Sequence, residues 1–135
     1  MARKVSDSQR LTPLETLIMN VVWDESPAAV KQVQQRLNSV KPMAYNTVLT
    51  MMRILRNKGF LASEREGKAD LYRPTVTREA IGRRSLGELI DSFFSGSAEA
   101  LVSQVLDGQS LSDEELLAIR ADLDKTLKDR KKDQR

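Results

Sequence analysis

The sequence predicts a mainly α-helical (α+β) protein in which three helices, a β-hairpin and three further helices follow one another. Apolar residues recur at the spacing of amphipathic helices along most of the chain. The main exception is residues 60–75, where the pattern alternates around Gly67-Lys68. The first 75 residues hold 12 Lys and Arg against 7 Asp and Glu, whereas the rest hold 10 against 12. This asymmetry indicates a basic binding half and a second half of another purpose.

The first helix is predicted to begin sharply within the segment Leu-Thr-Pro-Leu-Glu at 11–15. Thr12 suits the N-cap, Pro13 suits the first helical position, and Glu15 completes a capping box with Thr12. The apolar face of this helix extends to about Trp23. We interpret Trp23 as a core residue near the helix end, because buried aromatic side chains usually pack against other apolar groups.

A short second helix is expected at about residues 29–38, and the turn at 38–42 leads into a third helix at 44–59. One face of the third helix is apolar and comprises Ala44, Val48, Met51, Met52 and Leu55. The opposite face carries short polar groups and one arginine, at Asn46, Thr50, Arg53 and Asn57, and Thr47 lies at the edge of this stripe. No acidic residue occurs in this helix, whereas a merely solvated face normally mixes both signs of charge.

Residues 60–75 are predicted to form a β-hairpin with its turn near Gly67. A helix-turn-helix followed at once by a hairpin is a winged helix-turn-helix with a β-hairpin wing. Two readings of the hairpin tip remain open. Either Arg65 and Lys68 lie along a phosphate backbone, or the tip is a solvated surface of mixed charge, since acidic residues are close by.

Three more helices are expected between residues 77 and 127. Thr77 caps the first, Ser95-Gly96-Ser97 ends it, Gly108 closes the second, and Ser112 opens the third in a capping box. Helices this short and few do not enclose a good core. We expect a second copy of this lobe, rather than the winged helix, to cover them in a twofold dimer. The predicted dimer contacts are Leu89, Phe93, Leu101, Val105, Leu116, Ile119 and Leu123.

The 135-residue chain contains neither cysteine nor histidine. We therefore expect no metal, no cofactor and no catalytic residue. The acidic cluster Asp113, Glu114 and Glu115 is the candidate for a hydrolytic enzyme, but the first turn of a helix favours carboxylates without catalysis. No apolar run approaches the roughly 20 residues of a membrane span, and the N-terminus has no signal-peptide core. A cytoplasmic protein without membrane insertion is expected.

These residues resemble the penicillinase-repressor (BlaI/MecI) family of bacterial transcriptional repressors over about residues 11–127. The resemblance rests on the opening 11–15, on Val22-Trp23, and above all on Ala44-Tyr45-Asn46-Thr47-Val48 with Leu55, Lys58-Gly59-Phe60-Leu61 and Tyr72-Arg73-Pro74. It implies a homodimer with an N-terminal winged helix and a C-terminal helical dimerisation lobe. It also implies binding to a palindromic operator near a promoter, often controlling β-lactam resistance.

The resemblance further implies a membrane sensor protease as a partner, which releases the repressor by cleaving its dimerisation lobe. The staphylococcal-type cleavage site is an Asn-Phe pair after the Gly-Ser break, and the matching place here is Gln104-Val105. We therefore expect such a protease to leave this chain intact. Copper-responsive relatives carry a C-terminal cysteine cluster, which is lacking here, so metal induction of that kind is not expected.

The predicted function is that of a dimeric, sequence-specific DNA-binding repressor; the alternative is a winged-helix protein-interaction module without sequence-specific readout. Amide, hydroxyl and guanidinium groups read base edges and bind phosphates. We expect major-groove contacts from Asn46, Thr47, Thr50 and Arg53, and backbone contacts from Tyr45, Lys58, Lys68 and Thr12. The expected parts are a flexible arm, the winged helix, the dimerisation domain and a flexible tail, at residues 1–10, 11–76, 77–127 and 128–135.

Overall fold

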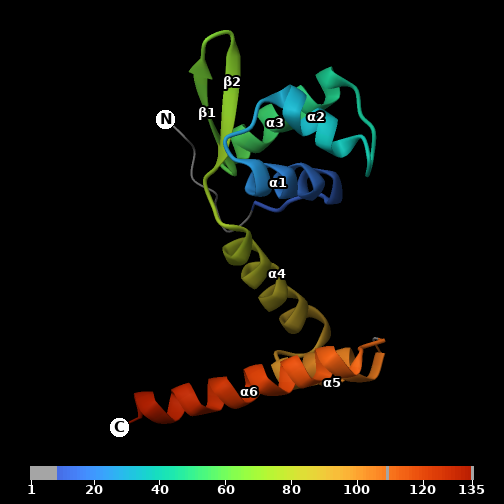
Figure 1. Cartoon of the computed structure of the whole chain (residues 1–135), viewed down its shortest axis with the longest axis vertical. Helices are drawn as coiled ribbons and strands as arrows, with labels where there is room; N and C mark the ends of the chain where they lie inside the picture. Colours follow the sequence, from blue (N-terminus) through green and yellow to red (C-terminus); the bar gives the residue numbers. More distant parts are fainter. Residues whose placement is uncertain (1–8, 109, 135) are drawn as a thin grey trace. The chain divides into compact units, whose positions relative to one another are not determined.

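The computed structural model describes residues 9–108 and 110–134 (Figure 1). The chain divides into two compact units, one reaching Ser85 and the other beginning at Leu86. The division falls inside a helix, so the first turns of that helix belong with the N-terminal unit. The predicted functional boundary between residues 76 and 77 stays a prediction, and residues 1–8 of the predicted arm lie outside the described residues.

The N-terminal unit is a winged helix, as the sequence predicts. Its helices pack together and the hairpin extends from them (Figure 1). Its elements are α1 (Pro13–Glu25), α2 (Val30–Leu37), α3 (Tyr45–Lys58), β1 (Leu61–Glu66), β2 (Ala69–Pro74) and the start of α4 (Arg78–Phe93).

The predicted start of α1 is confirmed in detail. The side-chain oxygen of Thr12 accepts a hydrogen bond from the N–H of Glu15 at 3.1 Å. In return the Glu15 carboxylate accepts one from the N–H of Thr12 at 2.8 Å. Both bonds of the capping box are therefore present, and they satisfy donors that the helix itself leaves without partners.

The hairpin is antiparallel, with Leu61 opposite Pro74 and Glu66 opposite Ala69. Gly67 adopts φ 63°, in the left-handed region that favours glycine, which confirms the predicted turn position. A further pairing joins Ala28, between α1 and α2, to Tyr72 of β2. Each of these two residues donates its N–H to the other's carbonyl, at 3.0 and 2.8 Å. This bridge anchors β2 to the helical part of the unit.

The core of the N-terminal unit is aliphatic with two buried aromatic residues, Phe60 and Tyr72. The apolar face predicted for α3 is buried at Val48, Met52 and Leu55, and Met51 packs against it. Ala44 is exposed, so its predicted place on this face is wrong. The reason is that Ala44 is the extended N-cap, which precedes the helix. Trp23 packs against the core near the end of α1, as expected.

The C-terminal unit contains the rest of α4, α5 (Ala98–Gly108) and α6 (Asp113–Asp133). The predicted break after α4 is confirmed, with Ser95 and Gly96 at φ 51° and 79°. The predicted capping box of Ser112 and Glu115 opens α6. None of the described residues of α4, α5 or α6 is buried in the single chain.

Helix α6 extends beyond the end of its apolar stripe at Leu127 and reaches Asp133. Residues 128–133 of the predicted tail are therefore helical, and the flexibility of the tail stays a prediction. Its last turn carries Arg130, Lys131 and Lys132, and cations at this end of a helix are stabilised by the helix dipole. Among the described residues, no helix combines the length and the apolar character that crossing a membrane requires.

Candidate nucleic-acid interface

Helix α3 is held by three neighbours, α1, α2 and β1. Its buried face comprises Val48, Met52 and Leu55. At its end the chain turns at Gly59, whose φ of 95° lies in the left-handed region that a side chain disfavours. The N–H of Phe60 then donates to the carbonyl of Leu55 at 2.9 Å, which leads the chain into the hairpin. The outer face of α3 is thus presented on a rigid support.

That outer face is the polar stripe that the sequence predicts. Its members at Asn46, Thr47, Thr50 and Arg53 are all exposed, and Tyr45 beside them is 46% exposed. Within the part of the chain that the structure describes, the side chains of Asn46, Thr47, Thr50 and Arg53 have no hydrogen-bond or ion-pair partner. Their donors and acceptors are therefore available to an external ligand.

Lys58, at the end of α3, faces inward instead. Its ammonium group donates to both carboxylate oxygens of Glu15 at 2.9 Å and to the carbonyl oxygen of Arg10 at 3.3 Å. The Lys58 side chain is 27% exposed, and that of Glu15 is 4% exposed. The cation expected to contact a DNA backbone is thus engaged within the protein, and so is the hydroxyl of Thr12, which caps α1.

The pKa of Glu15 reflects this environment. Burial of the carboxyl raises its pKa, but the backbone N–H of Thr12 and the Lys58 ammonium favour the charged form more strongly. The net result is a pKa below the ordinary value of 4.5. Glu15 is consequently charged at neutral pH, and its ion pair with Lys58 links the start of α1 to the end of α3.

The wing is tied to α3 by a residue that sequence reasoning missed. The guanidinium of Arg56 donates to the hydroxyl of Ser63 on β1 at 3.0 Å. Arg56 is half-buried between the exposed stripe and the core. The signal was its position at the flank of the polar stripe, but the partner lies on another element and no local pattern identifies it.

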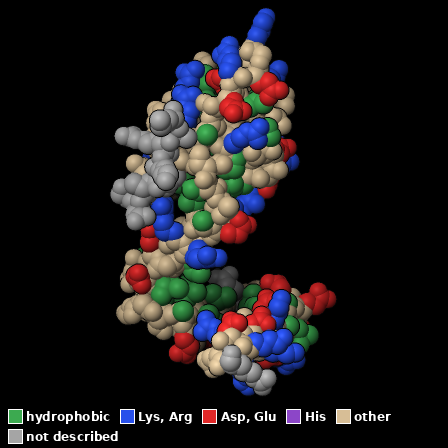
Figure 2. Space-filling view, turned by 90° about the vertical axis from the view of Figure 1, so that its left-hand side faces the viewer, with side chains coloured by type: hydrophobic (Ala, Val, Ile, Leu, Met, Phe, Trp, Pro, Cys, Tyr) green, Lys and Arg blue, Asp and Glu red, His purple; other side chains and the backbone are tan. Residues whose placement is uncertain are grey.

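The tip of the wing carries Arg65 and Lys68, the two cations for which either a phosphate contact or a solvated surface is predicted. Arg65 is partly engaged, since its guanidinium lies 3.9 Å from the Asp70 carboxylate and donates to the carbonyl of Gly67 at 3.4 Å. Lys68 is exposed and has no partner within the described residues. Lys and Arg side chains are visible around the hairpin at the top of Figure 2. Lys68 is therefore the cation of the tip that is available to a phosphate.

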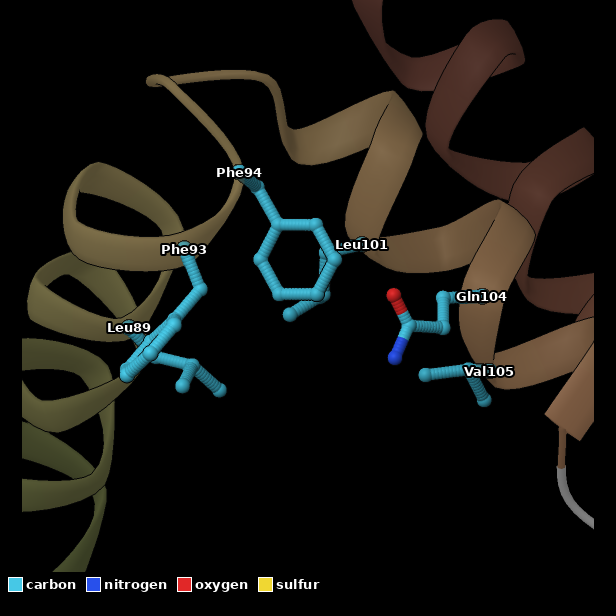
Figure 3. A pocket seen from close by; sticks show the side chains of 6 residues that line it. All are labelled: Leu89, Phe93, Phe94, Leu101, Gln104 and Val105. Carbon is cyan, nitrogen blue, oxygen red and sulfur yellow. The ribbon is translucent and has the colours of Figure 1, made fainter.

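Apart from Leu101, which is half-buried, the residues predicted for dimer contacts are exposed on the C-terminal unit. Hydrophobic side chains of this unit appear in the lower part of Figure 2. Figure 3 shows that side chains from the end of α4 face those of α5 across an open groove of about 470 Å³. Phe93 is 78% exposed in this groove. The residues that line the groove are Leu89, Phe93, Phe94, Leu101, Gln104 and Val105. On α6, Leu116, Ile119 and Leu123 are also exposed.

Comparison with known proteins identifies the family. Residues 11–125 match the sequence model of the family described as penicillinase repressor. The chain belongs to the penicillinase repressor family. This family consists of DNA-binding transcriptional repressors and not of enzymes, so the predicted family and class of function are confirmed.

Two relatives show the extent of the similarity. The chain is 25% identical over 107 residues to the penicillinase repressor of Bacillus licheniformis, covering 79% of this chain and 84% of the relative. It is 31% identical over 93 residues to the transcriptional regulator BlaI of Mycobacterium tuberculosis strain H37Rv, covering 67% of each. The solution structure of the DNA binding domain of the repressor BlaI is 26% identical, with a TM-score of 0.47, and the match covers 51% of this chain and 84% of that one.

Proposed function

We propose that this repressor binds a palindromic DNA operator as a homodimer and that α3 reads the operator in the major groove. The observation that carries the proposal is the exposed stripe of Asn46, Thr47, Thr50 and Arg53, whose side chains have no partner within the described residues. Such groups match the donors and acceptors that base edges present. Because the name of the Bacillus licheniformis relative is penicillinase repressor, we propose genes of β-lactam resistance as targets.

Each residue of the interface has a proposed role. Asn46 pairs with the edge of an adenine, and Arg53 contacts a guanine or a phosphate. Thr47 and Thr50 offer a hydroxyl contact or pack on a thymine methyl group. Tyr45 and Lys68 hold the DNA backbone. For Thr12 and Lys58 we propose a supporting role, because their polar groups are already engaged within the protein.

The homodimer is supported by the exposure of the C-terminal unit, since none of the described residues of α4, α5 or α6 is buried in the single chain. Leu116, Ile119 and Leu123 lie on α6 with 39–58% of their surface exposed. Burial of apolar surface is the main driving force of stable association. A second copy of the chain supplies the same apolar surface, so the two surfaces can cover each other across a twofold axis. The dimer then presents two α3 helices to the two half-sites of a palindromic operator.

The test separates base readout from phosphate contact. Operator duplexes are first selected from random DNA with the purified protein, and binding is then followed by fluorescence anisotropy. Asn46→Ala is expected to cost about 1–3 kcal/mol on the selected operator. Its loss on a scrambled duplex should be small, because non-specific binding rests on phosphates. Equal losses on both duplexes would favour the alternative, a winged helix that serves as an interaction module.

Lys68→Ala provides the opposite signature. It should weaken binding to both duplexes alike and reduce the slope of affinity against salt by about one. Lys128→Ala is the matched control, because Lys128 is an exposed lysine on α6 and the same charge is removed. If both lysine variants change the salt slope equally, the wing makes no specific phosphate contact.

A further inference from the structure

Arg78, the first residue of α4, is fastened to the C-terminal half of α1. Its guanidinium donates to the side-chain oxygen of Asn20 at 3.2 Å and to the Asn20 carbonyl at 3.1 Å. It also donates to the Asp24 carboxylate at 2.8 Å. The guanidinium carbon lies 5.4 Å from the centre of the Trp23 ring, a distance at which a cation is attracted to the ring face. One side chain therefore contacts three residues of α1.

The following turns of α4 are attached along the same face. Ile81 packs against the core, and the Arg84 guanidinium donates to the carbonyl oxygen of Gln9. Residues 78, 81 and 84 are three apart, so they align on one side of the helix. Gly82, whose backbone freedom would loosen a helix, lies between two of these attachments. Just before α4, the indole N–H of Trp23 donates to the carbonyl of Val76 at 2.8 Å.

The energetics argue against a role in stability alone. The side chains of Arg78 and Asp24 are 45% and 49% exposed, and ion pairs this exposed contribute little to the free energy of folding. Their geometry is nevertheless specific, because the planar guanidinium satisfies three acceptors and covers a ring at the same time. An attachment that adds little stability but fixes a direction serves to orient the two helices.

We propose that Arg78 is a positioning residue, which fixes the direction in which α4 leaves the winged helix and thereby the spacing of the two recognition helices in the dimer. Helix α4 runs from Arg78 to Phe93, and its first turns belong to the N-terminal unit, so Arg78 lies at the start of the helix that leads into the C-terminal unit. The functional part of this inference rests on the proposed homodimer. Arg78 then determines which separation of operator half-sites is bound best, without contacting DNA itself.

The first test measures the orientation within one chain. The sequence has no cysteine, so Lys31→Cys on α2 and Asp91→Cys on α4 introduce two exposed sites for spin labels. Labelled chains are diluted with unlabelled chains, and the distance distribution is measured by pulsed dipolar spectroscopy. Arg78→Ala should broaden or displace this distribution. Arg83→Ala should not, because Arg83 is exposed and has no partner among the described residues. An unchanged distribution in Arg78→Ala, or equal broadening in both variants, would overturn the proposal.

The second test measures the consequence for DNA. Duplexes carry two selected half-sites whose separation is varied in single base-pair steps. Arg78→Ala should lower the preference for the best separation by about two- to fivefold, the factor that an exposed ion pair with a cation–π contact is worth. Its affinity for a single half-site should equal that of the parent. Retention of the full preference would refute the functional part. A parent that gains nothing from a second half-site would refute the palindromic dimer instead, while the distance measurement still decides the role of Arg78.

Discussion

The ion pair between Lys58 and Glu15 offers the sharpest test of how α3, the proposed recognition helix, is held. Methionine in place of Lys58 is similar in length to the aliphatic part of the lysine side chain. It lacks the ammonium that donates to both carboxylate oxygens of Glu15 at 2.9 Å. Glu15 then keeps its bond from the N–H of Thr12 but lies buried as a charge without a counter-ion. Removing one partner of a fully buried pair costs about 3–5 kcal/mol. Because the Lys58 side chain is 27% exposed, we expect about 2–3 kcal/mol here.

The assay uses the single tryptophan of the chain, Trp23, which packs against the core of the N-terminal unit. Its fluorescence reports the unfolding of this unit separately from the C-terminal helices. A loss of this size should lower the midpoint of thermal unfolding by about 10–20 °C. Lys31→Met is the matched control, since Lys31 is exposed and has no partner in the described chain. A difference below about 0.5 kcal/mol between these two variants would refute the reasoning, because exposed substitutions reach that value on their own.

The same pair makes a prediction for pH. The pKa of Glu15 is lowered in the folded state, so its stabilisation is complete above the ordinary value of 4.5. It is lost as the pH falls through the lower, folded-state pKa. In Lys58→Met the remaining partner no longer outweighs burial, so the folded-state pKa of Glu15 should rise above its ordinary value. Protonation then favours the folded state, and the stability that Lys58→Met has lost relative to the parent should be partly recovered as the pH falls. A stability difference between the two proteins that stays constant on acidification would show that Lys58 does not set this pKa.

Two further predictions concern the C-terminal unit. Leu123→Asp places a charge on the apolar stripe of α6 and should yield a monomer in sedimentation with unchanged Trp23 fluorescence. The control Lys125→Asp, on the same helix, should stay dimeric. If Leu123→Asp is still a dimer, the interface lies elsewhere. A sensor protease that cuts family members should leave the Gln104-Val105 bond intact, because Gln104-Val105 stands where the cleavable Asn-Phe pair is expected. One clean cut at this bond in mass spectrometry would disprove this.

The features that the sequence predicts correctly depend on residues close together in the chain. The capping boxes opening α1 and α6 each join residues three apart, and the hairpin turn requires only Gly67 in its place. The exposure of Asn46, Thr50 and Arg53 follows in the same way, because helical periodicity alone separates them from the buried face. Ala44 shows where periodicity stops applying, since it precedes the first helical residue.

The features that the sequence does not reveal join distant residues. The pairing of Ala28 with Tyr72 depends on backbone groups, which every residue type carries, so no side-chain pattern marks it. Lys58 and Glu15 are 43 residues apart, and many other opposite charges were equally available. The sequence therefore predicts a DNA contact for Lys58, whereas its ammonium contacts the buried carboxylate of Glu15. Arg78 and Asp24 are 54 residues apart, so their contact has no local pattern either.

The contrast between the two units bears on how such a repressor responds to a signal. The N-terminal unit has a buried core of its own, whereas none of the described residues of α4, α5 or α6 is buried in a single chain. If a partner supplies the missing burial, folding of the C-terminal unit and dimerisation are one linked equilibrium. A perturbation of this unit then lowers operator affinity without unfolding the winged helix, because each protomer keeps its recognition helix but loses the second half-site. With the proposed homodimer, control of repression is most effectively exerted on the C-terminal unit, far along the chain from the residues proposed to read DNA.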